Sequence, residues 1–283
     1  PKKIVNSVSY WQYLRDYQQS LFNTFRADPV TRDTVKILSP GWRCIDTDLI
    51  AGMGDIDAWV DGHEIHTYAT SPFPPERSTM FGVADAAFGV ADPAKPVFVG
   101  EVGFNTDPTT WAAGKDPVAY KDRFMPRQLL YHFDHGVAAC VVYLMTNTSD
   151  GSLWSTGDDA DVYGWIKPSG LVQPSYTSVQ NLIALLQDPG ARFATTNLNF
   201  TISGATTNLM YTLMQKRSGR YYLAVWVGTY DNDTRAITIN LPASISSARL
   251  ARPNTDRTWT TQPISANTIT YVADGYVSLF ELW

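Results

Sequence analysis

The sequence has no excess of charge of one sign and no long apolar run. Its 22 lysines and arginines oppose 27 aspartates and glutamates, which gives a formal net charge of -5. Without a basic surplus or a block of like charges, nucleic acid and anionic membranes are not expected partners. No apolar run approaches about 18 residues, so we expect no membrane-spanning helix.

Cysteine is scarce, with only Cys44 and Cys140, which lie far apart in apolar contexts. A disulfide framework or a zinc site needs more than this, so we predict two buried thiols. The HEIH stretch contains His63 and His66, but on a strand these would point to opposite faces and could not chelate one ion. We therefore expect neither a metal nor a cofactor.

Glutamate is also scarce, with four in the whole chain: Glu64, Glu76, Glu101 and Glu281. Glu76 lies in PPERS, where a carboxylate at a helix start complements the helix dipole. Glu281 belongs to the last predicted strand. Glu101 differs, because it ends the apolar run PVFV and has a glycine on either side of the EV pair. We expect Gly100 and Gly103 to leave room for a ligand near the backbone.

Helices and strands alternate along the first 190 residues. Periodicity and turn residues predict helices at 9–27, 43–53, 75–91, 117–135 and 175–187, and strands at 34–39, 57–67, 96–102 and 138–145. Such alternation predicts parallel β/α units. The segments 96–100 and 138–144 are almost continuous apolar runs, which predicts strands buried on both faces.

The pattern changes after Asp188-Pro189-Gly190 to short alternating segments separated by turn residues. This pattern is typical of an antiparallel β-sandwich, and we assign it to residues 191–283.

Polar side chains follow the predicted parallel strands. One strand ends with His66 and Tyr68, the next with Glu101, and the last with Tyr143 and Asn147. In parallel β/α barrels the working residues gather at the carboxyl ends of the strands. The sequence therefore predicts a site there, although a salt-bridged carboxylate at a strand end remains the alternative for Glu101.

The motif GEVGF after an apolar strand, preceded by a strand with His-x-Tyr, resembles the clan A glycoside hydrolases, especially families 5 and 39. The resemblance covers essentially the whole chain. It implies a (β/α)8 barrel followed by a β-sandwich, with residues 1–190 as the C-terminal half of the barrel (strands 5 to 8) and 191–283 as the sandwich.

The resemblance also implies a retaining mechanism with two carboxylates about 5 to 5.5 Å apart. Glu101 matches the nucleophile, Tyr68 the residue that hydrogen-bonds it, and His66 a neighbour lining the site, with a core histidine as the alternative for His66. The acid/base glutamate of the clan ends strand four in Asn-Glu-Pro. By this resemblance it would lie just before Pro1.

About 190 residues of barrel-like sequence fall short of the roughly 250 typical of the fold. Half a barrel would expose apolar strand edges. We therefore expect an N-terminal chain or fragment that completes the barrel. Glu64 could replace the missing acid, or it could be a paired structural charge.

The loop at 149–165 mixes aspartates with Trp154 and Trp165. It is interpreted as a sugar-binding rim, a calcium site or a solvated acidic loop. Trp42 is a further candidate stacking surface, because sugar rings pack on aromatic faces.

The first hypothesis is a retaining O-glycoside hydrolase acting on a β-linked oligo- or polysaccharide. Glu101, Tyr68 and His66 are assigned to catalysis, and substrate binding to Trp42, Tyr143, Asn147 and Trp154. The alternative is a non-catalytic carbohydrate-binding or scaffold protein derived from such an enzyme.

Overall fold

The protein is described from a computed structural model. The structure describes residues 4–5, 8–41, 51–68, 74–77, 95–107, 111, 114–147 and 160–283. The chain forms two compact units, the first made of Pro1–Tyr68, Ser78–Gly103 and His132–Tyr143 and the second of Ala69–Arg77, Phe104–Tyr131 and Leu144–Trp283. No helix within the described ranges combines the length and hydrophobicity that crossing a membrane requires.

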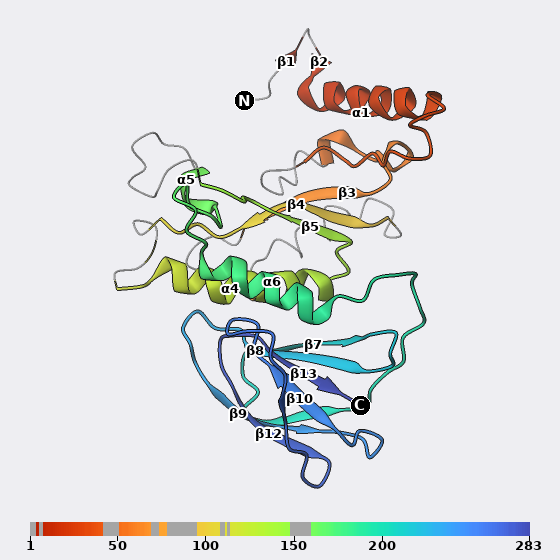
Figure 1. The fold of residues 1–283 in the computed structure, drawn as a ribbon. Helices are drawn as coiled ribbons and strands as arrows, with labels where there is room; N and C mark the ends of the chain where they lie inside the picture. Colours follow the sequence, from red (N-terminus) through yellow and green to blue (C-terminus); the bar gives the residue numbers. More distant parts are fainter. Residues whose placement is uncertain are drawn as a thin grey trace. The chain divides into compact units, whose positions relative to one another are not determined.

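The first unit is built on a three-stranded parallel sheet with the order β3-β4-β5 (Figure 1). Its strands are β3 (His63–Tyr68), β4 (Val97–Gly103) and β5 (Ala139–Val142). The predicted parallel strands at 96–102 and 138–145 are thus confirmed. The strand predicted at 57–67 begins later than expected, because Asp57–Trp59 form a 3-10 turn, η1.

The strand predicted at 34–39 is wrong except at one residue, since only Leu38 makes a parallel bridge, to Gly62. The physical reason lies in Asp61, whose carboxylate accepts a hydrogen bond from the Ile37 N–H at 2.7 Å. A side chain thus takes the donor that a neighbouring strand would need.

The two apolar strands differ in burial. Val99 and Val102 of β4, the central strand, are fully buried, but Val97 and Phe98 are only partly buried, so the predicted burial on both faces holds in part. The same prediction is wrong for β5, where Val141 is 60% exposed. Among the described strands β5 pairs only with β4 and so forms an edge of the sheet.

The N-terminal part contains a short hairpin and a long helix. The hairpin pairs β1 (Ile4–Val5) with β2 (Val8–Ser9), and α1 runs from Tyr10 to Ala27. Ser9 caps the helix by accepting a hydrogen bond from the Gln12 N–H at 3.3 Å, as its position before the periodic segment predicts. Most of the helix expected at 43–53 lies outside the described residues. Its described part, 51–53, is helical.

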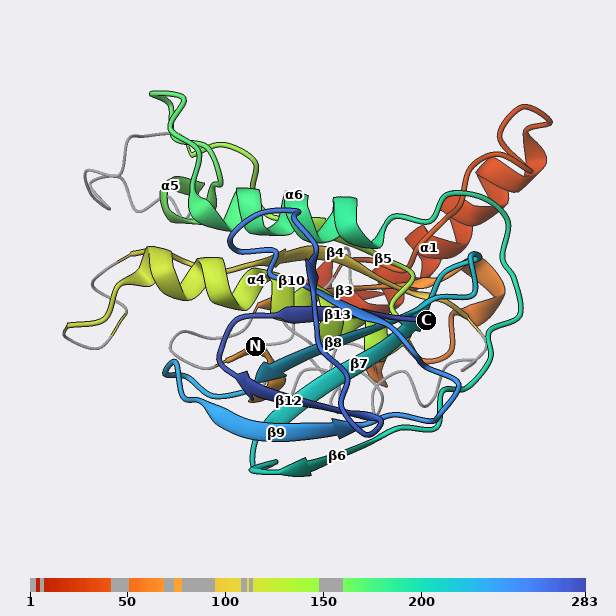
Figure 2. The ribbon, with the colours of Figure 1, turned by 60° about the horizontal axis from the view of Figure 1, so that its bottom comes forward.

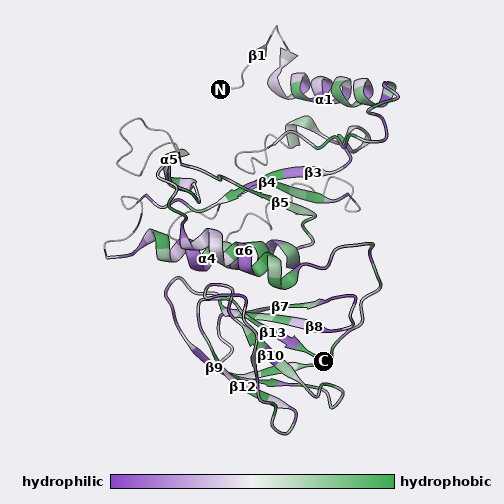
Figure 3. Ribbon diagram, viewed as in Figure 1, coloured by the Kyte–Doolittle hydropathy of each residue, from purple (hydrophilic) through white to green (hydrophobic). Residues whose placement is uncertain are grey.

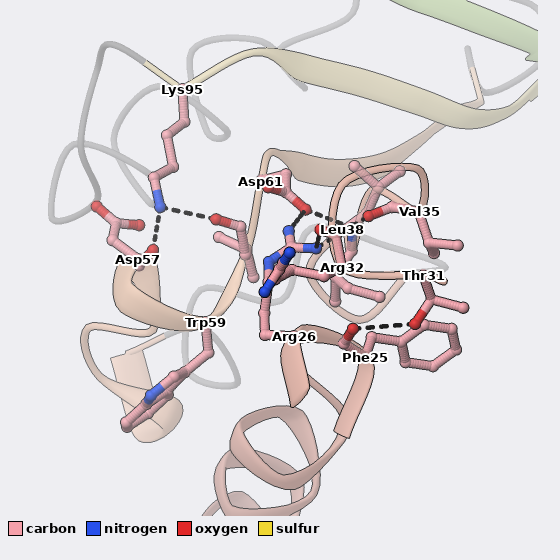
Figure 4. A network of polar contacts seen from close by, with 12 residues as sticks. Phe25, Arg26, Thr31, Arg32, Val35, Leu38, Asp57, Trp59, Asp61 and Lys95 are labelled. Carbon is pink, nitrogen blue, oxygen red and sulfur yellow. Dashed lines mark hydrogen bonds and ion pairs between the residues drawn. The ribbon is translucent and has the colours of Figure 1, made fainter. Parts of the chain in front are cut away.

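A polar network anchors the segments that lead into β3 and β4 (Figure 4). Arg26, near the end of α1, forms an ion pair with Asp61 at 2.5 Å and donates to the Val35 carbonyl at 3.0 Å. Burial raises the pKa of Asp61, but the hydrogen bonds from Ile37 and Arg26 outweigh it and hold this pKa below its usual value. Lys95, just before β4, donates to the Val60 carbonyl at 2.8 Å. The starts of both strands are therefore tied to the same network.

The second unit contains two antiparallel sheets (Figures 1 and 2). The five-stranded sheet has the order β11 (Thr260–Thr261), β10 (Ala248–Ala251), β13 (Ser278–Leu282), β8 (Tyr221–Val227) and β7 (Leu209–Gln215). The three-stranded sheet has the order β12 (Thr268–Ala273), β9 (Arg235–Asn240) and β6 (Thr201–Gly204).

Both faces of β8 are buried, which explains its unbroken apolar sequence YYLAVWV. Leu223, Val225 and Val227 belong to an apolar cluster shared with Ile239 of β9 and other residues of the two sheets. The alternate residues Tyr222, Ala224 and Trp226 join a second cluster with leucines of the helices α4 (Pro117–Asp134) and α6 (Pro174–Leu186). The helices predicted at 117–135 and 175–187 are thus confirmed. A short further helix, α5, spans Ala160–Tyr163.

Glu76 has partners that the sequence pattern does not reveal. It lies in the 3-10 turn η2 (Pro75–Arg77), and the rest of the helix predicted at 75–91 falls outside the described residues, so the helix-start interpretation stays a prediction. The Glu76 carboxylate pairs with the fully buried Arg127 through contacts of 2.8 and 2.5 Å. It also accepts a hydrogen bond from the Trp226 indole N–H at 2.6 Å. A buried charge needs such partners, because desolvation otherwise makes it costly.

The first unit also buries a histidine beside one of the predicted thiols. His132 is 1% exposed, with Nε2 3.1 Å from Thr67 Oγ1 and Nδ1 3.2 Å from Cys140 Sγ. Burial lowers the pKa of His132 to about 3, with a smaller contribution from the charge of His135. Burial also raises the pKa of the Cys140 thiol to about 12. Cys140 is half-buried and not in a disulfide, and Cys44 lies outside the described residues.

The His132→Gln variant should remove part of the acid sensitivity of folding. Between pH 6.5 and about 3 the unfolded chain binds a proton at this position that the folded chain does not. The wild type should therefore lose stability as pH falls through this range, by on the order of 5 kcal/mol from this group. Urea unfolding at several pH values measures the difference. An identical pH dependence for wild type and His132→Gln would contradict this assignment.

Candidate active site

The strand β3 is polar yet buried. Figure 3 shows β3 coloured largely hydrophilic, whereas its neighbour β4 is largely hydrophobic. His63, Glu64 and Thr67 are each less than 9% exposed. Buried polar groups are costly unless they are partnered, so this strand must carry a network of contacts.

The two histidines of β3 have different surroundings. His63 Nε2 lies 3.2 Å from Asp57 Oδ1, whereas His66 lies between two glutamates. Glu64, His66 and Tyr68 are spaced by two residues and therefore share one face of the strand.

A register shift brings Glu101 onto that face. Ile65 pairs with Val99, but the next residue, His66, pairs with Glu101, so Gly100 is an extra residue in β4. Such a β-bulge re-aims the side chains that follow it. Tyr68 is then paired with Gly103.

Two side chains of β3 contact one oxygen of Glu101. The Tyr68 hydroxyl donates to Oε2 at 2.6 Å, and His66 Nδ1 lies 3.3 Å from the same oxygen. A charge-assisted O–H bond of this length is strong and directional. Both contacts hold the carboxylate from one side.

Glu64 contacts the ring nitrogen of His66 that does not contact Glu101. Its Oε1 is 3.1 Å from His66 Nε2, and its side chain is 10% exposed. His66 thus contacts a glutamate through each ring nitrogen. Of the two interpretations of Glu64, this geometry favours the paired charge.

The expected space beside Gly100 is not free for a ligand. A Cβ at position 100 would lie 1.7 Å from Glu64 Oε1, and a Cβ at Gly41 would lie 2.5 Å from Glu64 Oε2. The two glycines therefore make room for the Glu64 carboxylate. Sequence reasoning missed this role, although the polar residue two positions before His66 was a signal for it.

Exposure separates Glu101 from the other glutamates. The side chains of Glu64, Glu76 and Glu281 are 10%, 4% and 3% exposed, and all three pair with a histidine or an arginine. The Glu101 side chain is 36% exposed. It combines partners on one side with access from solvent on the other.

Of the remaining candidate residues that the structure describes, only one contacts the residues around Glu101. The ring of Tyr143 lies edge-to-face with that of Tyr68, with centroids 6.3 Å apart. Asn147 belongs to the second unit, where it is buried and its side-chain oxygen accepts a hydrogen bond from the Gly164 N–H at 2.6 Å. Trp42 and Trp154 lie outside the described residues.

Most of the loop at 149–165 also lies outside the described residues. Its last residue, Trp165, is buried and packs edge-on against Tyr176. This residue therefore does not form part of an exposed rim. Its indole packs against α6 instead.

No family model matches the sequence, and no curated protein matches it. Solved structures do match. A family 39 glycoside hydrolase from the gut symbiont Bacteroides cellulosilyticus WH2 aligns with 100% of this chain and 56% of its own, at 14% identity and a TM-score of 0.65. An α-L-arabinofuranosidase from Thermotoga maritima aligns with 95% of this chain and 62% of its own, at 12% identity and a TM-score of 0.60.

A third match is CelM2, a bifunctional glucanase-xylanase from a metagenome library, with 96% of this chain and 59% of the other covered, 10% identity and a TM-score of 0.58. At identities of 10–14% these likenesses show a shared fold alone, and at that level the expected resemblance to glycoside hydrolases is supported. The chain spans little more than half of the length of the enzymes that it resembles.

The contact between Gly100 and Glu64 can be tested with a double-mutant cycle. Gly100→Ala should destabilise the protein by about 1–3 kcal/mol, because the new methyl group and the Glu64 carboxylate cannot share one site. In a Glu64→Ala background the same substitution should cost at least about 1 kcal/mol less. Denaturant unfolding of the four proteins measures both values. Equal costs in the two backgrounds would show that Glu64 does not occupy this space.

Proposed function

We propose that the protein is a retaining O-glycoside hydrolase acting on a β-linked oligo- or polysaccharide, with Glu101 as its nucleophile. The observation that carries this proposal is the state of Glu101: partly exposed, at the end of a bulged strand, with Tyr68 and His66 on one carboxylate oxygen. The likeness in fold to glycoside hydrolases supports it. This chemistry needs neither a metal nor a cofactor.

The contacts suit the first step of a double displacement. The Glu101 carboxylate attacks the anomeric carbon and forms a glycosyl ester, while the bond to the leaving oxygen breaks and an acid protonates that oxygen. Water then attacks the ester with the same group acting as base. The Tyr68 hydroxyl donates a hydrogen bond to the nucleophile, and His66 and Tyr68 together fix its orientation.

The acid/base carboxylate is proposed to come from outside this chain, in a segment that completes the barrel. Glu64 is a poor substitute, because it is engaged with His66 and enclosed by Gly41 and Gly100. The exposed Val141 on the edge strand β5 is an apolar surface that such a segment would cover. In this proposal residues 1–190 form the C-terminal half of the barrel and 191–283 a β-sandwich.

Substrate contacts are proposed for Tyr143 and, as expected from the sequence, for Trp42 and Trp154. Asn147 is buried and its side-chain oxygen is engaged with Gly164, which does not favour a substrate contact. Tyr143 has geometric support, since its ring contacts the ring of Tyr68. The second candidate function is a non-catalytic carbohydrate-binding or scaffold protein. Glu64, the carboxylate nearest to His66, is engaged with that histidine and is a poor acid. If the chain acts alone, this favours the second candidate.

Covalent labelling separates the two functions. Activated 2-deoxy-2-fluoro β-glycosides carry a good leaving group, so attack by the nucleophile does not need the acid. A panel of such glycosides should add one glycosyl mass to the wild type, at the peptide that contains Glu101, as read by mass spectrometry. Tyr68→Phe should label about ten times more slowly, because it loses one charge-assisted hydrogen bond.

The matched control is Glu101→Gln, which should stay unlabelled and keep its stability to within about 1 kcal/mol, because the side chain is partly exposed. Glu64→Gln should still be labelled at Glu101. Absence of labelling with the whole panel, or labelling at another residue, would contradict the proposed nucleophile and favour the scaffold function.

A further inference from the structure

The second unit has a pocket that the proposed chemistry does not use. It has a volume of about 460 Å³ and lies where β10 begins and β11 and β13 end, with Arg220, Arg249 and Trp283 among its lining residues. Ser247 and Gln262 also line it. The pocket is therefore bordered by two guanidiniums, an indole and small polar groups.

The two arginines share one buried carboxylate. Arg220 contacts Glu281 Oε1 at 3.1 Å, Arg249 Nε contacts Oε2 at 2.5 Å, and the Tyr222 hydroxyl donates to Oε1 at 2.6 Å. Burial raises the pKa of Glu281, but these hydrogen bonds outweigh it and hold the pKa below its usual value. Glu281 is therefore an anion, and the group of three carries a net charge of +1.

The arginines retain capacity for a second anion. Each guanidinium has five N–H donors, and the two oxygens of Glu281 cannot accept from all ten. The side chains of Arg220 and Arg249 are 40% and 36% exposed. Since both line the pocket, their remaining donors are available to a ligand there.

An indole lies next to this charge. Trp283 is 36% exposed, and the guanidinium carbon of Arg220 lies 4.5 Å from its ring centroid. Stacking of this kind holds the ring in place. An exposed aromatic ring beside polar groups suits a pyranose, whose C–H face packs on it.

We propose that this pocket binds a carboxylated sugar, such as a uronic acid unit of an acidic glycan. The carboxylate pairs with Arg220 and Arg249, where a planar guanidinium matches it with two parallel hydrogen bonds. The sugar ring packs on Trp283, and Ser247 and Gln262 reach its hydroxyl groups. The volume suits one or two sugar units. The choice of a sugar over another carboxylate rests on the proposed function, whereas the anion site does not.

Calorimetric titration of the full chain with trigalacturonate tests the proposal. The matched ligand is its methyl ester, which keeps the rings and loses the charges. The acid should bind, and the ester should bind at least about tenfold more weakly, because charge-assisted hydrogen bonds are lost. Inorganic phosphate at the same concentration should compete poorly, since it cannot stack on the indole.

Trp283→Ala and Arg220→Gln should each weaken binding of the acid about tenfold or more. Tyr211→Ala, which removes an exposed aromatic ring of β7 outside the pocket, should bind as the wild type does. Unfolding curves identify any variant that has lost its fold, and Trp283→Ala removes no partner of Glu281. Glu101→Gln should also bind normally, so failure of the hydrolase proposal leaves this result unchanged.

Three outcomes would overturn the proposal. These are no binding of trigalacturonate at about 10 mM, roughly tenfold above the weak end of common substrate KM values, equal affinity for acid and ester, or full binding by Trp283→Ala. Displacement by phosphate as effective as by the acid would show a simple anion site and would also overturn it.

Discussion

The Glu64 carboxylate occupies the space that a Cβ at Gly100 would fill, and it contacts His66 Nε2 from there. The geometry of Glu101 depends on this arrangement. Gly100 is the extra residue of the bulge, so the same position that admits Glu64 also turns Glu101 toward His66. One glycine thus sets both the partner of the histidine and the register that brings the histidine to Glu101.

The other two glutamates, Glu76 and Glu281, follow the same rule of partnered burial. Glu76 pairs with Arg127, and Glu281 pairs with Arg220 and Arg249. Burying an ion is tolerated only where charges and hydrogen bonds compensate its lost hydration. Glu101 departs from this pattern because solvent reaches it, and a nucleophile must be reached by its substrate. Partial exposure with one-sided support is therefore the physical feature that distinguishes it.

Much of the fold could be predicted from local sequence. The helices α1, α4 and α6 follow from apolar spacing and end signals, and β4 follows from an apolar run of suitable length. The segment 34–39 has the same composition as a strand, but a side chain, Asp61, takes its Ile37 N–H. Burial of β5 was also predicted wrongly, because an apolar run does not reveal how many neighbours a strand has. Such errors come from contacts between distant segments.

The candidate site, like the fold, could be predicted from the sequence only in part. The sequence alone determined that Glu64, His66 and Tyr68 share a face, because side chains alternate along a strand, and that Glu101 ends a neighbouring strand. Only the tertiary structure decided that the room at Gly100 belongs to Glu64, that Tyr68 and His66 meet the same oxygen of Glu101, and that Trp165 is buried. Spacing along one strand is a local property, whereas register between strands and the filling of space depend on which segments pack together.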